Sequence, residues 1–514
     1  MIFFSGVYLK LLMTEKDKTQ NRTQFIKWII IAVTAVLAFL LLVPLGLSFF
    51  SFPMPGDDYA NTLTTVEAWK NEGKVTSTIV AAFVHALDIY KNFQGNFTGV
   101  FIMALNPLLI SVTAYQWTLF GINLLFMVSV IWMLMSVMKT RWGMDKKAVL
   151  LIALLLLFVH YNRLMSFIEF GCNFTSASYY TLPFALAMLH LVLLFRINQS
   201  DKKCIGSIAL LVLMSAFLGL NNFPLAIMML AGLGFMVLFA FIKKHKRKNI
   251  FLVLFLVLAA FLALSLLAPG NSRRTDSEWV QSFGLVTVIY ASFVLGTKLI
   301  VTALVSTPLL GVMVLLTPML AESARKNKGR FTHPLLLAAL TYLVFIVQYV
   351  PVLYASGYDY HGRIENIKWA TCLIWIVVNY INWVGYLAQR HETKRPKRLL
   401  AASTVLGSAM VLFCLWAYYL APAKIDDALY VHRLNYETIY RQTVSGQLQT
   451  YRAEQAERFE MLDDADIVDV AFLPLTYDSV ICGKETLFED AEENRNRILA
   501  RHYDKNYILV LPQE

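Results

Sequence analysis

Apolar residues form long runs along most of the chain, and short polar segments separate them. Each run matches the roughly 17–25 residues that an α-helix needs to cross a bilayer. One stretch, 284–298, is expected to be an outer interfacial helix, and 97–113 is ambiguous between these two kinds of helix. The pattern predicts eleven membrane spans, at 28–50, 115–138, 148–165, 178–196, 204–220, 224–242, 249–268, 299–320, 333–352, 366–388 and 399–420.

Basic residues alternate between the loops in the way that the positive-inside rule describes. With the N-terminus inside, the predicted inner segments hold 26 Lys and Arg residues, against 8 in the outer loops before the tail. The distribution predicts a multi-pass protein of the cell (plasma) membrane. Residues 1–27 would be cytoplasmic, residues 28–420 would form the membrane domain with a long outer loop at 51–114, and residues 421–514 would be extracytoplasmic.

Composition supports the membrane class and helps to separate the tail. Of the 514 residues, 58% are hydrophobic and 15% are charged, whereas soluble domains carry about 25% charged residues. Residues 421–514 hold 10 basic and 18 acidic residues, so their net charge is −8. Because the whole chain has a net charge of +11, the rest of the chain carries +19. Because the basic residues sit in short loops between apolar runs, membrane topology explains them better than nucleic-acid binding.

The tail differs from the membrane domain in its periodicity. It is helical in pattern around Tyr436–Leu462, and two strand-like runs, Ile467–Leu475 and Tyr507–Leu511, flank a more helical Glu489–Ala500. The predicted fold class is therefore an all-α polytopic membrane protein with a small α/β extracytoplasmic domain at its C-terminus.

Specific polar residues gather on the outer side, beginning with an acidic pair, Asp57 and Asp58, after the Pro55-Gly56 turn. Asp58 can be explained as the N-cap of a following amphipathic helix. Capping requires only one acidic residue, so it does not explain Asp57. A carboxylate at the membrane edge can serve as a general base toward a hydroxyl nucleophile.

The outer arginines are the second group. Each of Arg273, Arg274 and Arg363 can be explained as an anchor that extends to lipid headgroups. Arginine is also suited to phosphate, because its planar fork donates two parallel hydrogen bonds. The three are therefore candidates for binding a lipid phosphate, and Lys298 could add a point charge.

Four further outer residues are candidate substrate contacts: Asn271, His361, Tyr179 and Glu169. A tyrosine at a span end is usually part of the aromatic belt, although it can also stack on a sugar ring. No histidine pair has metal-site spacing, so a divalent metal is possible but not indicated, and no cofactor is expected. The chain has no glycine-rich phosphate loop and no dinucleotide fingerprint, so a donor would reach the outer face already attached to lipid.

Together these landmarks resemble the GT-C superfamily of membrane glycosyltransferases, and in particular an uncharacterised bacterial branch of it. The resemblance rests on Gly56-Asp57-Asp58-Tyr59, on Ala268-Pro269-Gly270-Asn271 with the arginines that follow, on Tyr179-Tyr180 to Pro183, on His361-Gly362-Arg363, and on Asn494–Tyr503 in the tail. The chain departs from the branch pattern at Phe93-Gln94-Gly95-Asn96 and at Asn221-Asn222.

The resemblance implies an inverting enzyme that moves a sugar from a polyprenyl phosphate to a glycan, lipid or protein outside the cytoplasm. It implies that Asp57, and less directly Asp58, is the base, and that the arginines after Asn271 hold the donor phosphate. Two other functions stay open: a transporter or flippase for a lipid-linked sugar, and a non-catalytic assembly or sensor protein. The absence of an internal repeat and the odd span count disfavour the transporter.

Overall fold

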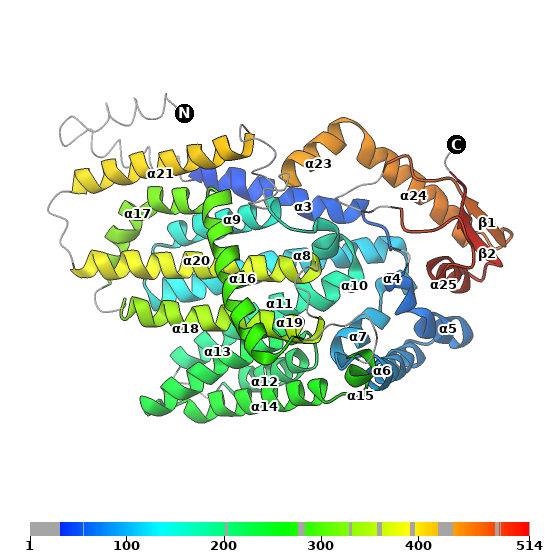
Figure 1. Cartoon of the computed structure of the whole chain (residues 1–514), viewed down its shortest axis with the longest axis horizontal. Helices are drawn as coiled ribbons and strands as arrows, with labels where there is room; N and C mark the ends of the chain where they lie inside the picture. The colour runs from blue at the N-terminus through cyan, green and yellow to red at the C-terminus, as the bar shows by residue number, and fades with distance from the viewer. Residues whose placement is uncertain are drawn as a thin grey trace.

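The chain is described by a computed structural model that covers residues 31–54, 56–200, 204–275, 283–327, 331–356, 362–390, 396–419, 435–477, 483 and 485–512. In these residues the protein is mostly helical, and most of the long helices lie side by side along a common axis (Figure 1). Nine helices of the described chain are long and apolar enough to cross a membrane. Eight of them, all except Leu285–Ser306, coincide with predicted spans, which supports a multi-pass membrane protein.

The helices of the membrane domain are α3 (Leu42–Leu47), α4 (Asp57–Ala60), α5 (Leu63–Glu72), α6 (Val75–Asn92), α7 (Phe97–Ala104), α8 (Val112–Leu134), α9 (Lys146–Asn162), α10 (Phe174–Ser176), α11 (Leu182–Gln199), α12 (Ile205–Gly219), α13 (Phe223–Ile242), α14 (Lys248–Leu266), α15 (Pro269–Thr275), α16 (Leu285–Ser306), α17 (Leu309–Arg325), α18 (Pro334–Ile346), α19 (Val350–Ser356), α20 (Gly362–Arg390) and α21 (Pro396–Tyr419). Helical residues precede α3, so that the first candidate span covers Ile31–Phe50. Two π-helical turns, Ile168–Cys172 and Ala177–Thr181, flank α10.

Polar residues at the ends of the apolar runs begin several of these helices. Ser111 accepts a hydrogen bond from the Ala114 N–H at 3.0 Å and starts α8, and Asn222 starts α13 in the same way. The Asp145 carboxylate accepts two backbone N–H groups at the start of α9. Such caps satisfy N–H groups that have no partner within the helix. The sequence therefore sets these helix starts locally.

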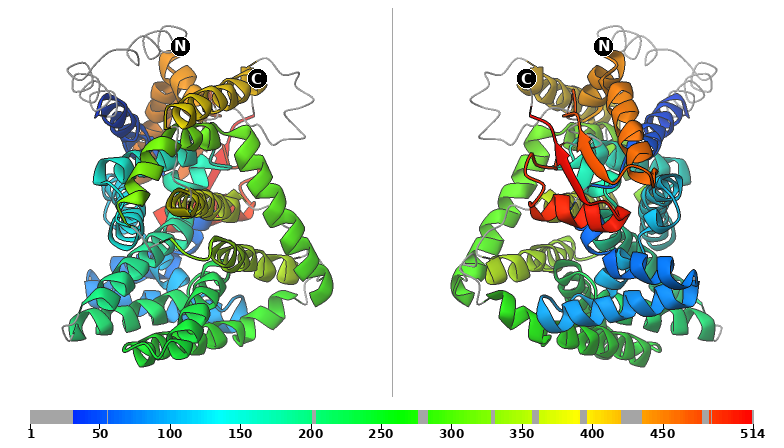
Figure 2. Two further views of the ribbon diagram at one scale, coloured as in Figure 1. Left: turned by 90° about the vertical axis from the view of Figure 1, so that its left-hand side faces the viewer. Right: turned by 90° about the vertical axis from the view of Figure 1, so that its right-hand side faces the viewer.

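The region 284–320 differs from its prediction. We expected an interfacial helix ending at 298 and a span starting at 299, and this division is wrong: α16 is continuous from Leu285 to Ser306. Thr307 is extended, as expected for a residue before proline, and Pro308 precedes α17. Figure 1 shows α16 crossing the direction of the other long helices, and the left view of Figure 2 shows it along one flank of the molecule.

Two of the predicted spans, 148–165 and 204–220, are present as shorter helices, α9 with 17 residues and α12 with 15 residues. The predicted span 299–320 is divided between the end of α16 and α17, which has 17 residues and extends to Arg325. Their helical structure agrees with the hydrophobic pattern. The complete count of eleven spans stays a prediction.

The tail has the predicted mixture of helices and strands. It contains α23 (Asn435–Val444), α24 (Gln447–Asp463), β1 (Asp469–Phe472), α25 (Asn494–Tyr503) and β2 (Tyr507–Val510). The strands pair in parallel, with Asp469 opposite Tyr507. Parallel strands need a crossover connection, and α25 lies in it. Figure 1 shows this small domain at the right-hand end of the helical bundle, and the right view of Figure 2 shows it from that end.

Candidate functional site

Asp58 is completely buried and its carboxylate accepts five hydrogen bonds. Oδ2 accepts from the Met54 N–H at 3.1 Å, the Tyr115 hydroxyl at 2.8 Å and the Asn173 amide at 3.2 Å. Oδ1 accepts from the backbone N–H and the hydroxyl of Thr175, at 2.9 and 2.7 Å. Burial raises the pKa of Asp58, and the hydrogen bonds that it accepts oppose this rise.

This network fastens the loop at residues 51–114 to the bundle. Tyr115 belongs to α8, and its hydroxyl also accepts the Phe174 N–H at 3.0 Å. Asn173 caps α10 by accepting the Ser176 N–H at 2.8 Å. The interpretation of Asp58 as an N-cap is wrong, because Asp58 lies inside α4 and Gly56 occupies the cap position without a side-chain bond. Its position supports a scaffolding role, joining elements that are far apart in the chain.

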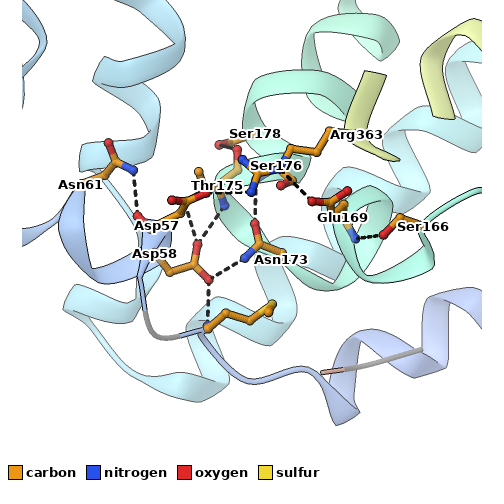
Figure 3. Close-up of polar contacts among 11 residues, drawn as sticks. Asp57, Asp58, Asn61, Ser166, Glu169, Asn173, Thr175, Ser176, Ser178 and Arg363 are labelled. Atoms are coloured by element: carbon orange, nitrogen blue, oxygen red, sulfur yellow. Dashed lines mark hydrogen bonds and ion pairs between the residues drawn. The ribbon is translucent and has the colours of Figure 1, made fainter. Parts of the chain in front are cut away.

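Asp57, the neighbouring residue, lies in a different environment. Its side chain is 53% exposed, and its carboxylate is 2.8 Å from Nη2 of Arg363. Nε of Arg363 lies 2.9 Å from Oε1 of Glu169, so one guanidinium joins two carboxylates. Figure 3 shows Asp57, Arg363 and Glu169 beside the buried Asp58 network. The structure thus brings together three of the residues that the sequence singled out.

Close packing positions the start of α20, which carries Arg363. A Cβ atom on Gly362 would lie 2.6 Å from Oε2 of Glu169 and 2.9 Å from Cβ of Ser166, so only glycine fits there. One turn along, the side-chain oxygen Oδ1 of Asn366 accepts the N–H groups of Met165 and Ser166. Arg363 is therefore held against the loop that carries Glu169.

The C-terminal domain packs on the same loop, residues 51–114. Tyr59 is buried, with its ring 4.8 Å from the ring of His502 in α25 and 6.0 Å from that of Tyr503. Burial, with a contribution from Lys70, lowers the pKa of His502 to about 4, so this imidazole is neutral at pH 7. Lys70 of α5 contacts Asp504 at 2.5 Å.

The Asn271 motif makes contacts of another kind. The side-chain oxygen of Asn271 accepts the Gly95 N–H at 3.0 Å, and its side-chain amide donates to the backbone carbonyls of Ser265 and Leu266. These bonds hold α15 against the end of α6 (Figure 1), and Arg273 donates to the side-chain carbonyl of Asn92. The motif therefore has a clear structural task in joining α15 to the end of α6.

The other predicted site residues are placed as follows. The Tyr179 hydroxyl accepts a hydrogen bond from the amide of Asn96. Lys298 is exposed on α16. The side chains of Arg274 and His361 lie outside the described residues.

Tyr115 and Thr175 are central to the Asp58 network, and neither was expected there from the sequence. Each is a polar residue at the end of an apolar run, and that signal is too common to indicate a partner. In the parts of the chain that the structure describes, no three His, Cys, Asp or Glu side chains are grouped so that they could hold a metal ion. What the site offers chemically is an exposed carboxylate, an arginine beside it and a second carboxylate.

Comparison with known proteins adds no assignment. No family model matches the chain, and no curated protein or solved structure is significantly similar to it.

Proposed function

We propose that the protein is a membrane glycosyltransferase of GT-C type that transfers a sugar, with inversion, from a polyprenyl phosphate to a hydroxyl acceptor outside the cytoplasm. The observation that carries the proposal is the exposed Asp57 carboxylate, 2.8 Å from Arg363 and next to the buried Asp58. The base is then the exposed aspartate, and the buried one holds it in place. The resemblance noted in the sequence and the predicted outer position of both residues support this assignment.

In the proposed reaction an acceptor hydroxyl attacks the anomeric carbon and Asp57 takes its proton. A new glycosidic C–O bond forms as the bond from that carbon to the donor phosphate oxygen breaks. The electron pair leaves with the polyprenyl phosphate, and Arg363 stabilises the negative charge that develops there. The acceptor is a glycan, a lipid or a protein of the cell envelope.

Arg363 contacts the base before any donor is bound. Asp57 and Glu169 already accept N–H groups of the Arg363 guanidinium, so a donor phosphate would compete with these two carboxylates for it. Movement of Arg363 toward the phosphate would release the Asp57 carboxylate to accept a proton. This arrangement would make Asp57 fully available only when the donor is in place.

Among the cationic residues we assign Arg363 the leading role, because it contacts Asp57. Arg273, Arg274 and Lys298 remain proposed phosphate ligands on the basis of the resemblance, and Asn271, His361, Tyr179 and Glu169 remain proposed substrate contacts. The proposal includes eleven spans in the plasma membrane, with the N-terminus in the cytoplasm and the C-terminal domain outside.

The test uses purified protein in liposomes and a panel of polyprenyl-phosphate sugars, with release of polyprenyl phosphate as the measurement. Asp57→Asn should reduce transfer by about 100-fold or more, the usual size of a general-base contribution. Glu72→Gln, which removes an exposed carboxylate elsewhere on the 51–114 loop, is the matched control and should retain activity.

Arg363→Lys keeps the charge but loses the planar fork, so it should weaken donor binding more than acceptor binding. Full transfer by Asp57→Asn would remove the proposed base. Movement of an intact lipid-linked sugar across the bilayer, with no release of polyprenyl phosphate, would favour the transporter instead.

A further inference from the structure

One arginine of the C-terminal domain lies beside the loop that carries Asp57. Helix α25 packs against α4 and α5, and the side chain of Arg495 passes over Gly56. A Cβ atom built on Gly56 would lie 3.4 Å from Nε of Arg495. Gly56 has a φ of +108°, which favours glycine, and it directly precedes Asp57.

The environment of Arg495 differs from that of a structural arginine. In the same domain, Arg458 is buried and its guanidinium lies 2.7 Å from Glu485. Arg495 is exposed, and among the described residues its recorded contacts are a 3.3 Å bond from Nη1 to the Thr486 carbonyl and the face of the Phe488 ring. Most of its N–H donors are therefore available to a ligand.

The backbone that carries Arg495 is firmly placed. Nη2 of Arg501 lies 2.6 Å from Glu67 of α5, and Lys70 pairs with Asp504 just beyond α25. Exposed ion pairs contribute little individually, at about 0–1 kcal/mol. The buried contact of Tyr59 with His502 and Tyr503 provides the apolar part of the interface. Arg495 is thus presented by a docked element.

Charge favours a further cation beside Asp57, Glu169 and Arg363. Asp57 and Glu169 contribute two negative charges and Arg363 one positive charge, so this cluster carries a net negative charge. A phosphate approaching such a cluster would be repelled, and a nearby arginine offsets the excess. Arginine can also bind a phosphate through two parallel hydrogen bonds.

We propose that the C-terminal domain supplies Arg495 as a further binding residue for the phosphate of a polyisoprenyl-phosphate donor, so that the donor site is complete only when this domain is docked. The inference rests on the proposed function and extends it, because it gives the tail a part in substrate binding. The phosphate group is what Arg495 recognises, and the isoprenoid chain is bound elsewhere.

The test measures binding of farnesyl phosphate, inorganic phosphate and farnesol to the full-length protein in nanodiscs. Arg495→Gln should weaken binding of farnesyl phosphate by about 10-fold to 100-fold, the range for loss of charge-assisted hydrogen bonds. Arg495→Lys should fall between this variant and the wild type. Farnesol, which lacks the phosphate, should bind equally to all variants. Arg497→Gln is the matched control, because it removes an exposed arginine from the same helix.

Inorganic phosphate separates a lipid phosphate from a free one. The proposal expects it to bind far more weakly than farnesyl phosphate, and equal affinity for the two would overturn the assignment to a lipid donor. Protease resistance of the tail, measured on each variant, should be unchanged by Arg495→Gln. Weaker binding that accompanies loss of this resistance, with no recovery in Arg495→Lys, would reduce Arg495 to a structural residue and overturn the inference.

Comparison with Arg363→Gln distinguishes the two proposals. Wild-type affinity in Arg495→Gln with weakened binding in Arg363→Gln would overturn the role of Arg495 and leave the proposed function intact. Wild-type affinity in both variants would overturn the phosphate site as a whole.

Discussion

Replacing Asp58 by asparagine tests the difference between the two neighbouring aspartates most directly. The carboxylate accepts five hydrogen bonds, and an asparagine side chain has one oxygen to accept them. The least costly orientation turns the new amide toward Thr175, whose hydroxyl can rotate to accept. The Thr175 N–H then loses its acceptor and faces another donor.

The expected cost follows from this count. A buried N–H without a partner costs about 1–3 kcal/mol, and the bonds that remain change from charge-assisted to neutral, which weakens each by about 1 kcal/mol. Removing the buried charge recovers part of this, because burial disfavours the ionised form of Asp58. We expect a net destabilisation of about 2–5 kcal/mol.

Asp57→Asn is the matched control for this measurement. It removes an exposed partner of Arg363, and exposed ion pairs contribute about 0–1 kcal/mol. Asp58→Asn should therefore lower the unfolding temperature of the purified protein, followed by tryptophan fluorescence, whereas Asp57→Asn should leave it close to wild type and lose transfer activity. Equal stability of the two variants would refute the structural role assigned to Asp58.

Two further predictions concern the tail and the topology. Because burial lowers the pKa of His502 from 6.5 to about 4, the undocked tail binds the proton more readily than the docked one. Docking of the tail should therefore be fully stable above about pH 6.5 and should weaken as the pH falls toward 4, by up to about 3 kcal/mol. The charged and polar neighbours of His502, which are Lys70, Asp504 and Tyr59, are the same in every variant compared. Protease cleavage of the tail measures this, and a pH dependence unchanged in His502→Phe would contradict it. For topology, a cysteine at His245 should be shielded from impermeant thiol reagents in intact cells and one at Asp466 should react; the reverse pattern would place the site in the cytoplasm.

The tail illustrates what local patterns could predict. Alternating burial along β1 and β2 follows from their apolar residues, with Val470, Phe472, Ile508 and Val510 buried. The helical period between the strands predicted α25. No such pattern indicated that α25 would pack on Tyr59, because that contact joins residues more than 400 positions apart in the chain.

The sequence by itself determined the membrane class, most of the helices and the acidic pair near the start of the 51–114 loop. These follow from hydrophobic length and local charge, because a helix satisfies its own backbone hydrogen bonds wherever it forms. The different roles of Asp57 and Asp58 were decided by the tertiary structure. Successive side chains on a helix point about 100° apart, so two adjacent aspartates can face different surroundings. One is surrounded by Tyr115, Asn173 and Thr175 and the other meets Arg363, and only folding brings those partners to them.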